Sequence, residues 1–162
     1  MKAAIIMGSK SDYPVVEKAE AILRQFQVEF ETRIISAHRT PKVAEEFAAT
    51  AEDKGIEVII AAAGKAAHLA GVLAAGTPIP IIGLPMKSST MDGLDSLLSV
   101  VQMPKGIPVA TVAIDGAENA GLLAVQILST KYPELRQAMK EYKAKMEQDI
   151  IALDEDFQAS KK

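Results

Sequence analysis

The chain has 162 residues, a hydrophobic fraction of 49%, a charged fraction of 24% and a formal net charge of −3. This length and balance predict one folded domain and argue against disorder. The chain contains no cysteine, which excludes disulfides, thiolate nucleophiles and zinc–thiolate sites and fits a cytoplasmic protein. Few aromatic residues and a negative charge argue against nucleic-acid binding, and the short apolar runs argue against a signal peptide or a membrane span.

Short apolar runs alternate with longer amphipathic segments along the chain. The runs predicted as strands are Ala3 to Met7, Phe30 to Ile35, Val58 to Ala63, Ile79 to Leu84 and Val109 to Ile114. The segments predicted as helices are Pro14 to Phe26, Pro41 to Lys54, Ala66 to Ala75, Leu94 to Val101 and Glu118 to Ser129. Most of the strands lack polar alternation, as expected when both faces of a sheet are covered.

This order of elements predicts a single-domain α/β fold, a three-layer α/β/α arrangement with a five-stranded parallel sheet of the flavodoxin-like kind. Residues 1–130 would form this catalytic domain. The last segment, Pro133 to about Phe157, has a helical period and no strand after it. We therefore expect residues 131–162 to be a protruding helical extension of the same domain that packs on other subunits.

In an open parallel sheet, ligands bind at the carboxyl ends of the strands. The first predicted strand is followed there by Gly8-Ser9-Lys10-Ser11-Asp12. Gly8 would let the backbone approach a ligand, Ser9, Ser11 and free N–H groups would favour phosphate, and Asp12 suits sugar hydroxyls. Simple helix capping is the alternative interpretation, since Ser and Asp are preferred caps. Walker and dinucleotide spacings are missing, so the expected ligand is a nucleoside monophosphate or ribotide.

The second predicted strand is followed by Ser36-Ala37-His38-Arg39-Thr40-Pro41. Arg39 could hold a phosphate in a bidentate fork, and Ser36 could add a hydroxyl. His38 has a side chain that titrates near neutral pH, so it is the candidate for moving a proton. A capping turn with a solvated His and Arg is the alternative.

The third predicted strand is followed by a small, nearly apolar loop, whose candidate binding residues are Gly64, Lys65, Ala66, Ala67, His68 and Leu69. Small side chains would let backbone amides close over a flat ring and would keep water out of the pocket. His68 has two interpretations, a catalytic residue or a structural histidine in the first turn of a helix.

Taken together, these motifs resemble the class I N5-carboxyaminoimidazole ribonucleotide mutases of bacterial de novo purine biosynthesis. GSKSD, SAHRTP and AAHL match three loops of that family. The later half adds matches at Asp95 to Ser99, Gln102 to Gly106 and Asn119-Ala120. The resemblance covers about Ala3 to Leu128, and several motifs in the same order make it more specific than any single loop.

The resemblance implies a mutase that converts N5-carboxyaminoimidazole ribonucleotide to 4-carboxy-5-aminoimidazole ribonucleotide by decarboxylation and recarboxylation. Ser9, Asp12 and Arg39 would bind the ribose phosphate, with Ser11 and Ser36 assisting, and His38 would be the general acid and base. It also implies a homo-octamer with sites shared between subunits and neither metal nor organic cofactor. Many relatives have Gly-Gly-Ala-Ala-His-Leu-Pro where this chain has Lys65 and Ala70, so we expect the stiffness, the charge and the closure of this loop to differ from theirs.

Two other functions stay open at this point. One is the related carboxylase that takes free CO2, although its expected His-Lys-Thr stretch and Gly-Arg-Ser-Asn-like third loop are missing. The other is a non-catalytic flavodoxin-like module that binds a phosphoribosyl ligand, which gives no reason for His38 beside Arg39. Turnover of the carboxyamino ribotide separates these possibilities.

Overall fold

The computed structural model describes residues 1–161 of the chain. Five strands form one parallel sheet in the order β2-β1-β3-β4-β5. Their bounds are Lys2–Met7 (β1), Glu29–Ile34 (β2), Val58–Ala63 (β3), Ile81–Pro85 (β4) and Ala110–Thr111 (β5). This is the strand order of the flavodoxin-like fold, and it confirms the predicted class.

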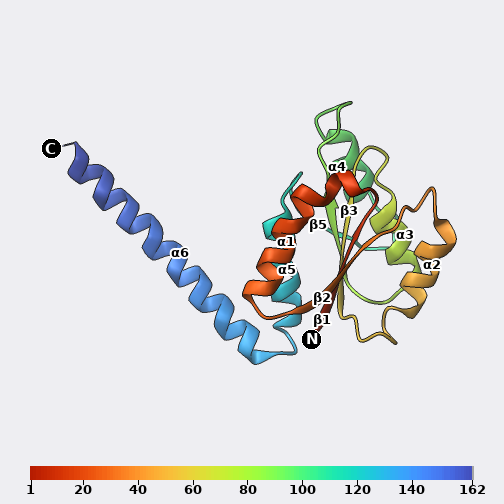
Figure 1. Ribbon diagram of the computed structural model, residues 1–162, viewed down its shortest axis with the longest axis horizontal. Helices are drawn as coiled ribbons and strands as arrows, with labels where there is room; N and C mark the ends of the chain where they lie inside the picture. Colours follow the sequence, from red (N-terminus) through yellow and green to blue (C-terminus); the bar gives the residue numbers. More distant parts are fainter. Residues whose placement is uncertain (162) are drawn as a thin grey trace.

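Helices cover both faces of the sheet, which gives the predicted three layers (Figure 1). The helices α1 and α5 lie against one face, and α2 and α3 lie against the other. The short helix α4 lies beside β4 near the carboxyl ends of the strands. Their bounds are Tyr13–Gln25 (α1), Pro41–Thr50 (α2), Leu69–Gly76 (α3), Leu94–Val101 (α4), Ala117–Leu128 (α5) and Pro133–Ser160 (α6), and a 3-10 turn, Lys10–Asp12 (η1), precedes α1.

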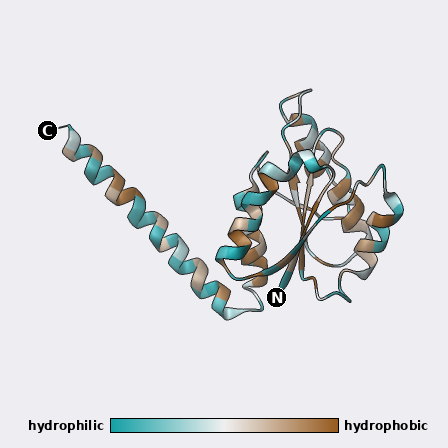
Figure 2. Ribbon diagram, in the orientation of Figure 1, coloured by the Kyte–Doolittle hydropathy of each residue, from teal (hydrophilic) through white to brown (hydrophobic). Residues whose placement is uncertain are grey.

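Two apolar cores hold these layers together. Strands β3 and β4 are buried along their whole length, and β1 is buried from Ala3 onward. Their side chains alternate between a core shared with α1 and α5 and one shared with α2 and α3. Figure 2 shows these central strands largely in the hydrophobic colour. Strand β2, with sequence EFETRI, is an edge strand whose charged residues oppose pairing with another sheet.

Four predicted elements are shorter than expected: α2 ends at Thr50 and not at Lys54, β4 begins at Ile81 and not at Ile79, and the other two are α3 and β5. Helix α3 begins at Leu69 and not at Ala66, because Lys65 has a left-handed φ of 57° and a tight turn follows, in which the His68 N–H donates to the Ala66 carbonyl. Strand β5 keeps only two regular residues. The Val112 and Asp115 N–H groups still donate to carbonyls of β4, at 3.1 and 2.9 Å, so beyond Thr111 the chain stays beside β4 without extending the ladder.

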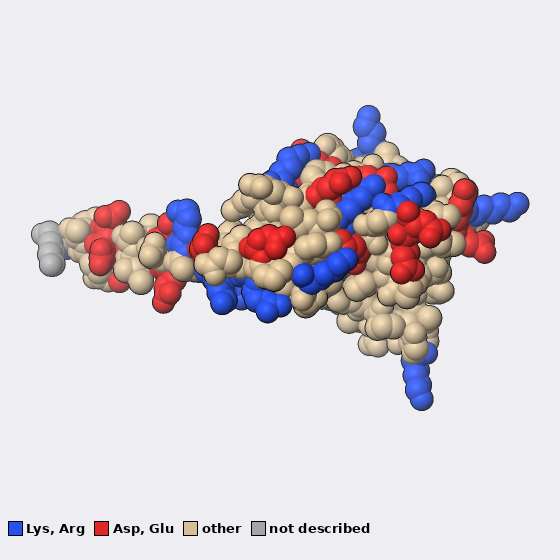
Figure 3. Space-filling model, turned by 90° about the horizontal axis from the view of Figure 1, so that it is seen from below, with Lys and Arg blue, Asp and Glu red and all other residues tan. Residues whose placement is uncertain are grey.

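Helix α6 leaves the body of the domain (Figure 1). Only its first turns pack on the body: Leu135 and Met139 are buried, and the Tyr142 ring lies 5.6 Å from the Phe26 ring. From residue 143 onward every described residue is exposed. Along α6 and the face of the body seen in Figure 3, acidic and basic side chains are interspersed. Within residues 1–161, no helix combines the length and apolar character that crossing a membrane requires.

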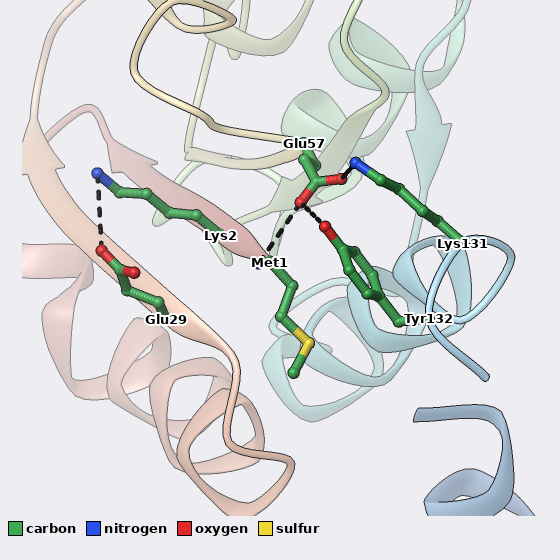
Figure 4. Close-up of polar contacts among 6 residues, drawn as sticks. All are labelled: Met1, Lys2, Glu29, Glu57, Lys131 and Tyr132. Atoms are coloured by element: carbon green, nitrogen blue, oxygen red, sulfur yellow. Dashed lines mark hydrogen bonds and ion pairs between the residues drawn. The ribbon is translucent and has the colours of Figure 1, made fainter. Parts of the chain in front are cut away.

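The connection into α6 is fixed to the body by Glu57, which directly precedes β3 (Figure 4). Its carboxylate accepts hydrogen bonds of 2.7 Å from Lys131 Nζ and from the Tyr132 hydroxyl, and lies 3.7 Å from the Met1 amino group. Burial alone would raise the pKa of Glu57, but these hydrogen bonds and the positive charges outweigh it, so the pKa lies below its ordinary value. The start of β1, the start of β3 and the α5–α6 connection therefore meet at one carboxylate.

Candidate functional site

The carboxyl ends of four neighbouring strands surround a cavity of about 680 Å³. The lining comes from the segments that follow β1, β2, β3 and β4, as expected for an open parallel sheet. The lining residues are Gly8, Ser9, Ser11, Asp12, Ser36, Ala37, His38, Arg39, Ala63, Gly64, Lys65, Ala66, His68, Leu69, Lys87, Ser88 and Ser89. Every site residue predicted from sequence is in this set except Ala67, whose methyl group is buried in the core beneath the loop.

The loop after β1 combines capping with an open carboxylate. Ser9 caps the η1 turn, because its Oγ accepts hydrogen bonds from the Ser11 N–H at 3.2 Å and from the Ser11 hydroxyl at 2.8 Å. Asp12 precedes α1 but makes no side-chain capping bond. The capping interpretation is thus correct for Ser9, while Asp12 faces the cavity.

Asp12 sits in an environment that disfavours its charge. Burial raises the pKa of its carboxyl above the ordinary 3.8. Hydrogen bonds with the Ser11 hydroxyl and the Ser9 backbone offset part of this rise, and the neighbouring Asp115 carboxylate adds to it. A ligand hydroxyl or N–H group that donates to Asp12 would stabilise its ionised form.

The loop after β2 is held against the loop after β1 by Arg39. Its Nη2 donates to the Gly8 carbonyl at 2.7 Å, and its Nε and backbone N–H donate to the Ser36 hydroxyl at 3.3 and 3.2 Å. Thr40 closes the same turn by a hydrogen bond from its hydroxyl to the Ser36 carbonyl. The guanidinium is therefore fixed in direction beside the hydroxyl-rich loop, an arrangement suited to an anion such as phosphate.

The two histidines of the chain meet inside this cavity. His38 Nε2 lies 2.9 Å from His68 Nδ1, and the ring planes are perpendicular with centroids 5.1 Å apart. One of these nitrogens must carry the proton that the other accepts, so the tautomers of the two rings are linked. His68 therefore contacts the proposed acid/base directly, whereas sequence alone left its role open.

Sequence reasoning missed the fourth wall of the cavity, Lys87, Ser88 and Ser89, which follows β4. The Lys87 N–H donates to Asp115 at 2.8 Å, and the Ser88 hydroxyl donates to Asp95 at 2.7 Å. Their position is the signal that points to them, because residues that follow the fourth strand reach the same edge of the sheet as residues that follow the first three.

More cationic side chains than carboxylates line the cavity. Arg39, Lys65 and Lys87 line it with Asp12, which favours an anionic ligand. Within residues 1–161, no three His, Asp or Glu side chains come together as a metal site requires. The arrangement can bind a phosphorylated ligand and move one proton through the histidine pair.

Comparison with known proteins agrees with this geometry. The chain is 62% identical over 145 residues to the N5-carboxyaminoimidazole ribonucleotide mutase of Pyrococcus abyssi, covering 90% of this chain and 83% of that protein. It is 52% identical over 147 residues to the phosphoribosylaminoimidazole carboxylase of Candida glabrata, covering 91% of this chain but 26% of that protein. The crystal structure of Treponema denticola PurE superimposes with a TM-score of 0.85 at 30% identity, covering 95% and 96% of the two chains. The profile of the AIR carboxylase family matches residues 2–149, and the chain therefore belongs to this family.

Proposed function

We propose that the chain is an N5-carboxyaminoimidazole ribonucleotide mutase, which moves a carboxyl group from the exocyclic nitrogen to C4 of the imidazole ring. The observation that carries the proposal is the histidine pair, 2.9 Å apart, beside Arg39 and the serine-rich loop. The relative that is 62% identical carries the name of this activity. The cavity offers the two things the reaction needs, an anion site for the ribose phosphate and a group that gives and takes one proton.

In the proposed complex, Arg39, Ser9 and Ser36 hold the phosphate, with Ser11 assisting. Asp12 accepts hydrogen bonds from the ribose hydroxyls, which relieves the burial of its charge. Residues 64–69 lie beside the imidazole ring, where Gly64 and Ala66 leave room for the ring and for a CO2 molecule.

The proposed reaction has two balanced steps. The N–C bond of the carbamate breaks and releases CO2 while His38 donates a proton to the exocyclic nitrogen. The enamine-like C4 then attacks the CO2 carbon, and His38 takes the proton from C4 as the ring regains its aromaticity. One proton is given and one is taken, and the CO2 stays in the cavity between the two steps. His68 would hold the His38 ring in the orientation that both steps use.

A labelled substrate tests the proposal. Substrate with labelled carbon in its carboxyl group should give product that keeps the label in unlabelled bicarbonate buffer. Loss of the label in a single turnover would indicate a carboxylase that takes free CO2, the activity named for the Candida glabrata relative. Binding of the ribotide without turnover would indicate a non-catalytic module.

We also infer that the chain assembles into a homo-octamer. Five apolar side chains of α6 are more than half exposed, at residues 146, 150, 151, 153 and 157, and they follow the part of the helix that packs on the body. A partner subunit would cover them, as expected for residues 131–162. Light scattering at micromolar concentration should give the octamer mass, and a monomer would overturn the inference. The cytoplasmic location expected from the sequence stays a prediction.

A further inference from the structure

We propose that Lys65 binds the carboxyl group that the reaction transfers, and thereby selects carboxylated over uncarboxylated ribotides. This inference rests on the proposed function and assigns a role to a residue where the family motif of the sequence analysis has glycine. The predicted chemistry needs a place for a second anion, because the substrate carries a carboxylate as well as a phosphate.

Lys65 is the cation of the cavity that has no partner in the described part of the chain. The Arg39 guanidinium is bonded to Gly8 and Ser36, and Lys87 Nζ lies 3.5 Å from Asp92. Among residues 1–161, the Lys65 ammonium makes neither a hydrogen bond nor an ion pair, and its side chain is exposed. Its charge can therefore serve a ligand without breaking an existing contact.

The position of Lys65 separates it from the phosphate end of the site. Arg39 follows β2 and Lys65 follows β3, and β1 lies between these two strands. Two strand spacings place the ends of β2 and β3, from which these loops start, roughly 10 Å apart, since neighbouring strands lie about 4.8 Å apart. The histidine pair bridges the two loops. A ribose and an imidazole ring fill such a gap. An anion beside Lys65 is then the group on the ring and not the phosphate.

The histidine pair places the reacting atoms of the proposed reaction on the same side of the cavity as Lys65. His68, in contact with His38, lies three residues after Lys65 in the same loop. The backbone of Lys65 has a φ of 57°, a conformation that costs about 1 to 2 kcal/mol for a residue with a side chain and nothing for glycine. Strain of this kind concentrates at functional positions, and Lys65 is a strained residue that lines the cavity.

This role predicts a specific kinetic pattern. The ammonium attracts the carboxylate of the substrate and of the product but has no charge to attract in neutral CO2. Removing the ammonium therefore weakens binding of the carboxylated substrate and product more than binding of the intermediate state that contains CO2. We therefore expect Lys65→Gln to raise KM about tenfold, between the effects of an exposed ion pair and of a charge-assisted hydrogen bond, without lowering kcat.

The test measures binding of two ribotides, 4-carboxy-5-aminoimidazole ribonucleotide and 5-aminoimidazole ribonucleotide, which differ in the carboxyl group. Calorimetry at low and at high salt is applied to the unmodified protein and to Lys65→Gln, Lys65→Gly and Lys65→Arg. Gln and Gly should each lose about tenfold affinity for the carboxylated ribotide only, Arg should retain it, and salt should erase the difference. Lys10→Gln is the matched control, because Lys10 is an exposed lysine of the η1 turn that does not line the cavity.

Equal losses for both ribotides in Lys65→Gln would overturn the proposal, because Lys65 would then not distinguish the carboxyl group. A loss in Gln that Gly restores would assign the effect to the loop backbone and also overturn it. Failure of the unmodified protein to bind either ribotide would refute the proposed function instead. An equal loss in Lys10→Gln would assign the effect to the net charge of the protein and would also overturn the proposal.

Discussion

Gly83, in the middle of β4, should not tolerate even a methyl group. A Cβ atom built at this position would lie 2.2 Å from Val100 Cγ1 and 2.9 Å from Val109 Cγ1, closer than real Cβ contacts. Val100 belongs to α4 and is buried against the sheet. Gly83→Ala would therefore push α4 away from β4.

The expected loss of stability follows from two opposing effects. Overpacking a close-packed core costs about 1 to 3 kcal/mol. Replacing glycine by alanine returns about 0.4 to 1 kcal/mol, because the unfolded chain loses conformational freedom. The middle values of the two ranges leave a net loss of about 1.3 kcal/mol, or about 3 to 5 °C in Tm for a chain of this size. Urea or thermal unfolding at one fixed protein concentration measures it, since assembly makes stability depend on concentration.

Val100→Ala provides the control. Alone it should destabilise the protein by about 1 to 3 kcal/mol, the value of burying a valine side chain. Combined with Gly83→Ala it removes the closer of the two clashes, the one with Val100 Cγ1, so the double variant should be more stable than the sum of the two losses predicts. Neighbouring residues that clash are coupled by at least about 0.5 kcal/mol. A Gly83→Ala protein as stable as the unmodified one, or strictly additive losses, would refute the packing argument.

Three further predictions concern the site and the junction with α6. His38→Asn should fold normally and lose turnover by at least about a hundredfold; near-normal activity would remove its assignment as acid and base. Arg39→Ala should weaken ribotide binding by about tenfold or more, measured by calorimetry, with Lys10→Gln as control. Ionised Glu57 stabilises the fold fully above pH about 4.5, the ordinary pKa of the group, and this stabilisation is lost as the pH falls through its lowered pKa in the folded protein. The difference in free energy of unfolding between the unmodified protein and Glu57→Gln should therefore shrink in acid. A difference that stays constant with pH would contradict this linkage.

The central strands were predictable because a strand that is buried on both faces is an uninterrupted run of apolar residues in the sequence. The expected run Val58 to Ala63 is β3 to the residue, since no polar residue interrupts it. The fifth run was predicted too long because Val109 to Ile114 contains the right residue types but lies at the edge, where only one neighbour can fix a regular ladder. Residue type alone does not distinguish these two positions.

The sequence predicts where the site lies in the fold better than it predicts how the side chains are arranged within it. Because ligands bind at the carboxyl ends of parallel strands, the sequence predicts that His38 and Arg39 line one cavity, and both residues do. The 2.9 Å contact of His38 with His68 depends on side-chain rotamers that spacing does not fix. The left-handed backbone of Lys65 was equally hidden, because lysine gives no local signal for a conformation that glycine adopts freely.

The strand order has a consequence for how the chain becomes active during synthesis. Strand β1 is made first but lies between β2 and β3, so its second neighbour emerges only after residue 63. The cavity takes its walls from four loops, the last of which ends at Ser89. A nascent chain therefore exposes the unpaired edge of the apolar strand β1 until β3 has been synthesised. Pairing between strands so distant in sequence is also slow. Substitutions that delay β3 should lower the yield of folded protein even where they leave the finished molecule unchanged.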